Sequence, residues 1–130
     1  MSQHEQITED LTEGHQMAER LLGNFPSLAY RRRGDRVWTM EFLDEGSRQI
    51  TGYVPEDLIE NREIAYGELI YPADRDIAWK TIKNAVEAGR AFHVAYRLKT
   101  ADGEEKWVYD QGRPVTSPAS DLLVLEGFIT

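Results

Sequence analysis

Strand-like segments on both sides of a helical block set the strongest limit on how this chain can fold. The segment 91–100 alternates polar and apolar residues, Asp102-Gly103 marks a hairpin turn, and the segment 105–116 alternates again. The last segment, 122–130, is apolar on both faces, so we expect it in the middle of a sheet. Strand runs separated by helices predict an α+β fold whose antiparallel sheet has helices on one face.

The first half of the chain predicts two further strands. Residues 28–33 and 37–43 have the composition of strands and are joined by a Gly-Asp turn. In the second of these strands we expect Trp38, Met40 and Phe42 on one face, because successive side chains of a strand point to opposite faces.

Between these strands and the hairpin, the sequence predicts short helices followed by a longer one. Glycine and proline punctuate residues 44–71, so each helix there has one or two turns. At Gly52 we expect a turn whose backbone favours glycine. Pro72 suits the first turn of a helix that runs to Ala88. The buried face of this helix should consist of Ala78, Ile82, Ala85 and Val86.

The first segment, residues 3–22, predicts an amphipathic helix. Its apolar stripe consists of Ile7, Leu11, Ala18 and Leu21. The stripe is narrow, so the helix could pack either on its own domain or on a second copy of itself. The second arrangement makes these four residues candidates for dimerisation. The chain then divides into a flanking helix, residues 1–23, and a domain, residues 24–130.

Composition narrows the class of protein. The chain has 130 residues, which fits one domain, and 41% hydrophobic with 29% charged residues is typical of a folded globular protein. A net charge of −8 argues against nucleic-acid binding, which needs a concentrated basic surface. The only basic run, Arg31-Arg32-Arg33, alternates between faces on a strand, and we interpret it as an exposed strand end.

Two absences from the sequence bear on chemistry and location. The chain has no cysteine, which excludes disulfides and thiolate chemistry and fits the cytoplasm. No apolar stretch approaches the roughly 20 residues of a membrane span, and residues 1–5 are polar and lack the core of a signal peptide. We expect a cytoplasmic domain with no membrane contact by this segment.

Five short segments, in their order and spacing, resemble the PAS family, and more closely its members with a PAC-like second half. The segments are Ile50-Thr51-Gly52-Tyr53 with Pro55-Glu56-Asp57-Leu58, Ile70-Tyr71-Pro72-Ala73-Asp74-Arg75, Ala95-Tyr96-Arg97-Leu98, Asp102-Gly103 with Lys106-Trp107-Val108, and Gly112-Arg113-Pro114-Val115 with Leu125-Glu126-Gly127-Phe128-Ile129. The resemblance spans roughly residues 24–130. One departure is Tyr71, which replaces the histidine usual before the proline.

The resemblance implies a PAS-like five-stranded antiparallel sheet with helices on one face and a cavity between them. In various family members this cavity holds haem, flavin, a small metabolite or nothing. The family also implies a sensory or signal-relay domain, not itself an enzyme, that belongs to a histidine kinase or diguanylate cyclase. The covalently linked output domain would then be missing from this chain. Family members often dimerise through a helix before the first strand, so a homodimer is expected.

No cofactor is predicted. Haem needs an axial ligand, usually histidine, and the longer helix that supplies it in relatives contains none. His4 and His15 lie on or before the first helix and His93 should face solvent, so no metal site is expected. Flavin photochemistry in the family uses a cysteine adduct, which this chain cannot form. An unidentified small ligand stays open.

The candidate ligand-cavity residues come from the strands and helices that should face one another. They are Met40, Phe42, Tyr53, Leu58, Trp79, Ile82, Tyr96 and Trp107, with Arg97 as a polar anchor. An alternative is a ligand-free interaction and dimerisation module, in which the same residues fill the core. A third alternative is a small cone-shaped α+β hydratase or isomerase, which needs a buried acid–base pair. The sequence nominates none, so no catalytic residue is predicted.

Overall fold

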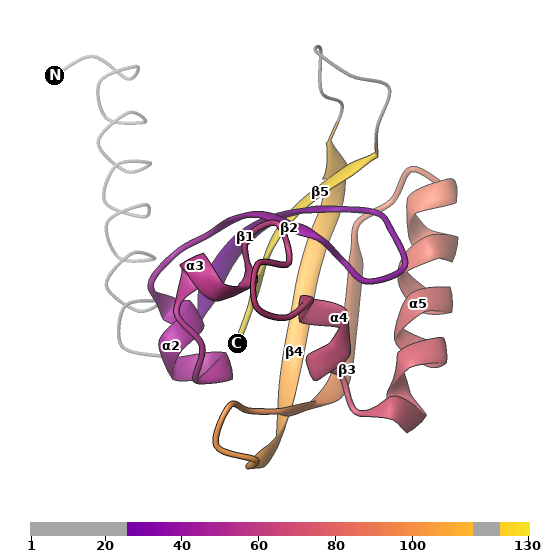
Figure 1. Ribbon diagram of the computed structural model, residues 1–130. Coiled ribbons are helices and arrows are strands. Elements are labelled where there is room, and N and C mark those ends of the chain that lie inside the picture. Colours follow the sequence, from indigo (N-terminus) through magenta and orange to yellow (C-terminus); the bar gives the residue numbers. More distant parts are fainter. Residues whose placement is uncertain (1–25, 116–122) are drawn as a thin grey trace, which may run out of the picture.

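An antiparallel sheet of five strands, with helices on one of its faces, forms the described part of the chain (Figure 1). The computed structural model describes residues 26–115 and 123–130. The strands are β1 (Leu28–Arg33), β2 (Met40–Leu43), β3 (Phe92–Lys99), β4 (Glu105–Val115) and β5 (Val124–Ile129), in the order β2-β1-β5-β4-β3. The predicted α+β fold is confirmed. The predicted first helix, with Ile7, Leu11, Ala18 and Leu21, lies outside the described residues.

The last strand, β5, lies at the centre of the sheet. It is antiparallel to β1 on one side and to β4 on the other. Val124, Leu125 and Ile129 are buried, as expected for a central strand. Because β5 joins β1 to β4, it unites the first and second halves of the chain in one sheet. The apolar final segment occupies the position that its composition predicts.

The hairpin of β1 and β2 departs from the regular pattern that the sequence predicts. Trp38 adopts a left-handed backbone with φ of 57°, so β2 begins only at Met40. The pairing with β1 also shifts register between Arg31 and Arg32. As a result Trp38 and Met40 are buried, whereas Phe42 is 54% exposed on the opposite face. The prediction that these three side chains share one face is wrong.

Four helices of the described chain pack on one face of the sheet, which we call the inner face (Figure 1). They are α2 (Gly46–Thr51), α3 (Pro55–Leu58), α4 (Tyr66–Leu69) and α5 (Pro72–Glu87). The longest, α5, packs mainly on β3 and buries Ala78, Ile82 and Ala85. It has a proline in its first turn and ends just before Gly89, whose φ is 68°. The predicted extent of this helix is confirmed.

The core lies between the inner face and the helices. Its largest fully buried side chains are Arg32, Tyr66, Tyr96, Leu28, Met40, Leu58, Ile70, Ile82, Leu98, Leu125 and Ile129. Most are aliphatic, as in any domain of this size. The three largest, however, carry polar groups that must find partners away from water.

Gly52 ends α2 with a left-handed backbone, φ of 80°, as the sequence predicts. We expect Gly52→Ala to lower the free energy of unfolding by about 1 kcal/mol, because alanine resists this conformation. An added Cβ would also lie only 3.1 Å from Cβ of Ala101. Urea denaturation of the variant measures the effect.

The matched control for this prediction is Gly89→Ala. Gly89 has a similar φ of 68°, but no atom lies within 4 Å of its added Cβ, so this variant carries the backbone strain alone. We expect it to lose less stability than Gly52→Ala. A Gly52→Ala protein as stable as the wild type would contradict the strained turn.

Candidate functional site

A buried ion pair lies in the core, between two strands that are not neighbours. Arg32 of β1 and Asp110 of β4 both have side-chain exposures of 0%, and Nη2 of Arg32 lies 2.8 Å from Oδ2 of Asp110. β5 separates these strands, so the pair bridges across it on the inner face. Removing two charges from water is costly, and only good geometry with further hydrogen bonds offsets that cost.

Three tyrosine hydroxyls surround the Asp110 carboxylate. Tyr30 donates a hydrogen bond to Oδ1 at 2.7 Å, and Tyr96 donates one to Oδ2 at 2.8 Å. The hydroxyls of Tyr66 and Tyr96 are 2.7 Å apart. Because the Tyr96 hydrogen is directed at Asp110, Tyr66 must be the donor of that bond. Both carboxylate oxygens therefore have hydrogen-bond donors. We call Arg32, Asp110, Tyr30, Tyr66 and Tyr96 together the polar cluster.

Apart from the Asp110 carboxylate, aromatic rings surround the Arg32 guanidinium. Its central carbon lies 4.4 Å from the ring centroid of Tyr30 and 4.5 Å from that of Trp38. Such cation–π contacts stabilise a desolvated cation in part. No nitrogen of the guanidinium has an aligned hydrogen bond to the described chain, although Nη2 lies close to Asp110. The charge of Arg32 is balanced, but its donors are not satisfied.

Two glycines of the central strands make room for the Tyr30 ring. Gly127 of β5 pairs with Tyr30 on one side and with Gly112 of β4 on the other. A Cβ on either glycine would lie 2.7 Å from the Tyr30 hydroxyl oxygen. The missing side chains allow Tyr30 to lie across the sheet and reach Asp110.

The tyrosines and the arginine of the polar cluster hold their protons at neutral pH. Burial raises the pKa of Tyr30, Tyr66 and Tyr96 far above the ordinary tyrosine value. Burial by itself lowers the pKa of Arg32, but the negative charge of Asp110 acts in the opposite direction, and the pKa is raised. The three hydroxyls stay neutral and Arg32 stays charged. These groups are poorly suited to exchanging protons with a substrate.

Six of the predicted cavity residues contact the core. The four buried ones, with exposures of at most 1%, are Met40, Leu58, Ile82 and Tyr96. Tyr53 and Trp79 are half-buried and pack against the same core. Their convergence between sheet and helices is what a cavity lining would require.

Two predicted cavity residues lie on the opposite, outer face of the sheet. Phe42 is 54% exposed and Trp107 is 67% exposed. Side chains alternate along β4, so burial of Val108 and Asp110 directs Trp107 outward. Phe42 faces outward because the pairing of β2 with β1 shifts register between Met40 and Phe42, so these two side chains point to opposite faces. Both assignments to the cavity are wrong.

Arg97 does not act as a polar anchor inside the core. Its Nε and Nη2 donate to the Asp74 carboxylate at 2.9 and 2.7 Å, and its backbone N–H donates to the same carboxylate at 2.9 Å. The rings of Tyr71 and Trp107 lie 4.2 and 5.5 Å from the guanidinium carbon. Arg97 instead ties the start of α5 to the edge strand β3, so its assignment to the cavity is also wrong.

Sequence reasoning missed the central residue of the site. Interpreting the arginine run as an exposed strand end is wrong for Arg32, which is fully buried. The signal was the alternation of β1, which places Arg32 on the same face as Leu28 and Tyr30. Asp110 follows buried Val108 in the same way. Opposite charges on two inward faces should pair, because an unpaired buried charge is very costly.

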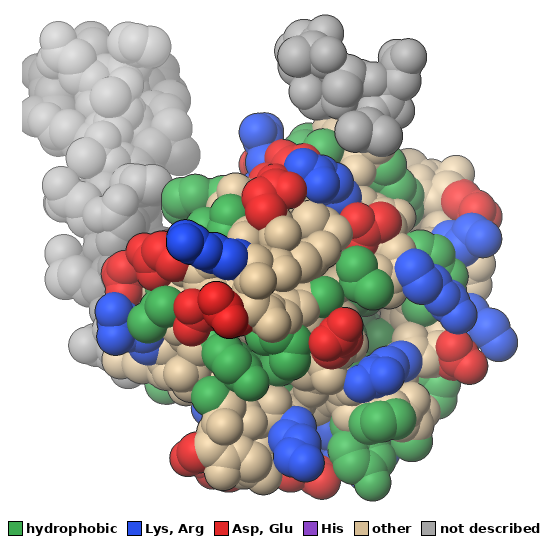
Figure 2. Space-filling view, in the orientation of Figure 1, with side chains coloured by type: hydrophobic (Ala, Val, Ile, Leu, Met, Phe, Trp, Pro, Cys, Tyr) green, Lys and Arg blue, Asp and Glu red, His purple; other side chains and the backbone are tan. Residues whose placement is uncertain are grey.

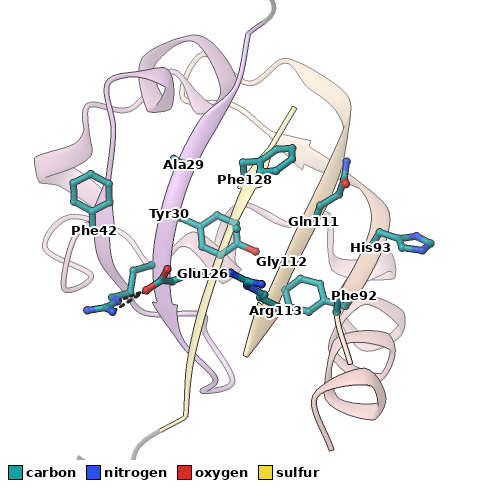
Figure 3. Close-up of a pocket in the computed structure, with 13 residues that line it drawn as sticks. Ala29, Tyr30, Phe42, Phe92, His93, Gln111, Gly112, Arg113, Glu126 and Phe128 are labelled. Carbon is teal, nitrogen blue, oxygen red and sulfur yellow. Dashed lines mark hydrogen bonds and ion pairs between the residues drawn. The ribbon is translucent and has the colours of Figure 1, made fainter. Parts of the chain in front are cut away.

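The outer face of the sheet has an open groove that the described helices do not cover (Figure 3). Figure 3 shows Phe42 at one edge, Phe128 near the middle and His93 at the other edge. Arg31 and Glu126 form an ion pair at 2.7 Å within it. The groove has a volume of about 800 Å³ and passes over the glycines of the central strands. Its mixture of aromatic rings and one ion pair resembles the composition of protein interfaces.

The face that has the helices is different in character. Figure 2 shows acidic and basic side chains interspersed over it. Within residues 26–115 and 123–130, no group of three or more His, Asp or Glu side chains is placed to hold a metal ion. In the part of the chain that the structure describes, no helix is long and apolar enough to cross a membrane.

The strand order, the short helices and the longer α5 on the inner face together define a PAS-type fold. A family model described as the PAS fold matches residues 40–129, which is most of the chain. The chain belongs to the PAS family, as its sequence motifs predict.

Solved PAS structures superimpose on most of this chain at low identity. The PAS domain of a protein from Colwellia psychrerythraea has a TM-score of 0.67 at 16% identity, covering 88% of this chain and 93% of that one. The N-terminal domain of a diguanylate cyclase with PAS/PAC sensor from Marinobacter aquaeolei has a TM-score of 0.64 at 15% identity, covering 80% and 93%. A sensory box histidine kinase/response regulator from Burkholderia thailandensis has a TM-score of 0.64 at 20% identity, covering 86% and 81%. These similarities show the fold.

A curated relative is much longer than this chain. The methyl sulfide methyltransferase-associated sensor of Methanosarcina acetivorans is 29% identical over 91 residues. The alignment covers 69% of this chain but only 9% of that protein. The chain is therefore a PAS domain that spans only a small part of the length of the curated sensor it matches.

Removing one partner of the buried ion pair should cost more stability than replacing both. Arg32→Met leaves the Asp110 charge buried without its cation, and we expect a loss of about 3–5 kcal/mol in the free energy of unfolding. Adding Asp110→Asn removes that charge and keeps one oxygen that accepts from one of the two tyrosines, Tyr30 or Tyr96. Urea denaturation should find the double variant more stable than Arg32→Met alone. A double variant less stable than the single one would contradict the pairing.

Acid should weaken the contact between Asp74 and Arg97. Hydrogen bonds from Arg97 hold the pKa of Asp74 below its ordinary value of 3.8. The folded state therefore binds a proton on Asp74 less readily than the unfolded state does. The contact stabilises the fold at pH values above the unfolded pKa of Asp74, and this stabilisation is lost as the pH falls through the lower, folded pKa. Asp74→Asn should lose stability at pH 7, and its difference from the wild type should shrink in acid. Urea midpoints measured across this range check the prediction.

A control for this prediction is Asp76→Asn on the same helix. The Asp76 side chain is 75% exposed and contacts Arg36 at 3.4 Å, so its removal should change little at any pH. A constant difference between Asp74→Asn and the wild type at all pH values would contradict the proposed linkage.

Proposed function

We propose that this chain is the sensory and signal-relay domain of a larger protein of the histidine kinase or diguanylate cyclase type, and that it works as a homodimer. The observation that carries the proposal is the set of exposed aromatic side chains on the outer face of the sheet. Phe42, Trp107, Tyr109 and Phe128 are 54%, 67%, 38% and 37% exposed. Apolar patches of this kind on a small domain mark surfaces that bind another protein segment.

A second copy of the chain is the occupant we propose for this face. The Arg31–Glu126 pair places one positive and one negative group among the aromatic rings, so two copies related by a two-fold axis can exchange these partners. Side-chain exposures of 47% and 46% leave both groups open to such an exchange. An interface of this type combines an aromatic centre with polar contacts.

The predicted first helix offers another occupant. Its stripe of Ile7, Leu11, Ala18 and Leu21 could pack on the outer face of its own domain, or it could form the dimer seam itself. Both arrangements keep the relay role, and they differ in the subunit count and in which substitutions separate the subunits.

The proposal has three further aspects. The chain has no catalytic role, since the carboxylate of Asp110 is occupied by Arg32, Tyr30 and Tyr96. We expect a cytoplasmic domain without haem or flavin, and therefore a colourless protein.

A ligand-free interaction module is the second candidate function, and it is favoured by the polar cluster that occupies the middle of the core.

Sedimentation velocity on the full chain at several concentrations tests the proposal. We expect a dimer in the wild type and dissociation in Phe42→Glu with Phe128→Glu, which places like charges against one another across the seam. Circular dichroism should stay unchanged, because both side chains lie outside the core. A wild-type protein that is monomeric at high concentration overturns the proposed homodimer.

The matched control is Ile77→Glu. Ile77 is 66% exposed on α5, away from the sheet, so this variant should remain dimeric. If the phenylalanine double variant also remains dimeric, the outer face is not the seam. In that case Leu11→Glu with Leu21→Glu would separate the subunits if the predicted first helix pairs with its copy.

A further inference from the structure

The Arg32 guanidinium has more hydrogen-bond donors than the surrounding chain has acceptors for them. Its side chain is fully buried, and Nε and Nη1 have no partner in the described structure. A guanidinium has five N–H donors and no acceptor of its own. A buried donor without a partner destabilises the folded state, so native proteins usually supply water or a ligand at such a place.

A small crevice lies next to Trp38, and Arg32 is not one of its lining residues. Its volume is about 150 Å³, and its walls include Trp38, Trp79, Ile82 and Leu125. Leu125 is the register partner of Arg32 in β5. The Trp38 ring lies 4.5 Å from the guanidinium carbon and also lines the crevice. Trp38 is therefore placed between the crevice and the unsatisfied donors.

Trp38 is held in an unusual backbone conformation at this position. Its φ of 57° is one that bulky residues avoid. Its N–H donates to the Asp35 carbonyl at 3.2 Å, and the Asp35 carboxylate accepts from the N–H and hydroxyl of Thr39 at 2.9 and 2.6 Å. The Trp38 ring contacts Trp79, with centroids 5.0 Å apart. Strain maintained by neighbours is common at functional sites, and a rotation of this ring would join the crevice to Arg32.

The charges of the polar cluster define which acceptor fits. Arg32 and Asp110 already balance each other, and the surrounding tyrosine hydroxyls are neutral. A second anion here would leave one negative charge unbalanced in a fully buried site. A carbonyl oxygen accepts hydrogen bonds and adds no charge. The crevice walls are mostly apolar side chains, and an apolar cavity of about 150 Å³ holds a molecule the size of benzene.

We propose that Arg32 and the crevice beside Trp38 bind a small neutral carbonyl compound. The carbonyl oxygen accepts hydrogen bonds from Arg32, and an apolar body about the size of a benzene ring lies between Trp38, Ile82 and Leu125. This inference rests on the sensory role proposed above and names the class of ligand that the domain senses. Binding requires Trp38 to move, which gives the domain two states that a ligand distinguishes.

Three probes of similar size test this chemistry on the full chain. Acetophenone has a neutral carbonyl, benzoate has a carboxylate, and ethylbenzene has no acceptor. Each is titrated into ¹⁵N-labelled protein while the arginine Nε–H and tryptophan indole signals are followed by NMR. We expect acetophenone to shift the signals of Arg32 and Trp38 and to bind about tenfold or more tightly than either other probe.

Two variants connect the binding to the proposed contacts. Arg32→Met with Asp110→Asn removes the donors without leaving a buried charge, and acetophenone should then bind no better than ethylbenzene. Should this double variant not fold, Val86→Phe fills the crevice from α5 and leaves Arg32 in place. It should abolish acetophenone binding, while Ile77→Phe on the exposed side of α5 should not.

The outcomes separate this proposal from its rivals. Tighter binding of benzoate would identify an anion site and overturn the proposal. If no probe shifts the Arg32 signal, water satisfies the donors, and the proposal fails. Sedimentation of the same samples is independent of either result. A dimer that binds no probe refutes the ligand alone, whereas a monomer that binds acetophenone refutes the dimer alone.

Discussion

The buried pair of Arg32 and Asp110 is the interaction on which the arrangement of this core depends. β5 lies between the two strands, so the charges meet only when β1, β5 and β4 pair in the correct register. A slip of one residue would turn either charge to the outer face and leave its partner buried alone. A costly pair can therefore specify a unique register even where it adds little stability. In this chain it does so across the strand that joins the two halves of the fold.

Much of the fold could be predicted because its signals are local. The turn at Asp102-Gly103, the helix that begins at Pro72, the turn at Gly52 and the central position of β5 each follow from a few adjacent residues. These features predict the α+β class, with an antiparallel sheet and helices on one of its faces. The family motifs agree with them, since the same residues form the turns and the helix start.

The candidate site could be predicted only in part, because its geometry depends on contacts between distant residues. Phe42 faces outward through the register shift in the β1–β2 hairpin, which alternation within one strand does not reveal. Arg97 reaches around the sheet edge to Asp74, a partner set by where α5 packs. The run Arg31-Arg32-Arg33 predicts an exposed strand end, so the sequence alone does not single out Arg32 as a buried residue. Pairing it with Asp110 requires knowing that β5 inserts between their strands.

The polar cluster and the outer groove are separated by a single layer of backbone. At Gly112 and Gly127 no side chain lies between them, and the Tyr30 hydroxyl rests against both glycines while it donates to Asp110. Phe128, next to Gly127 in β5, faces the opposite side and lines the groove. Close-packed interiors shift between discrete arrangements because they do not deform smoothly. In the proposed relay, a movement of Tyr30 would act directly on the β5 backbone and so connect the core to the outer face.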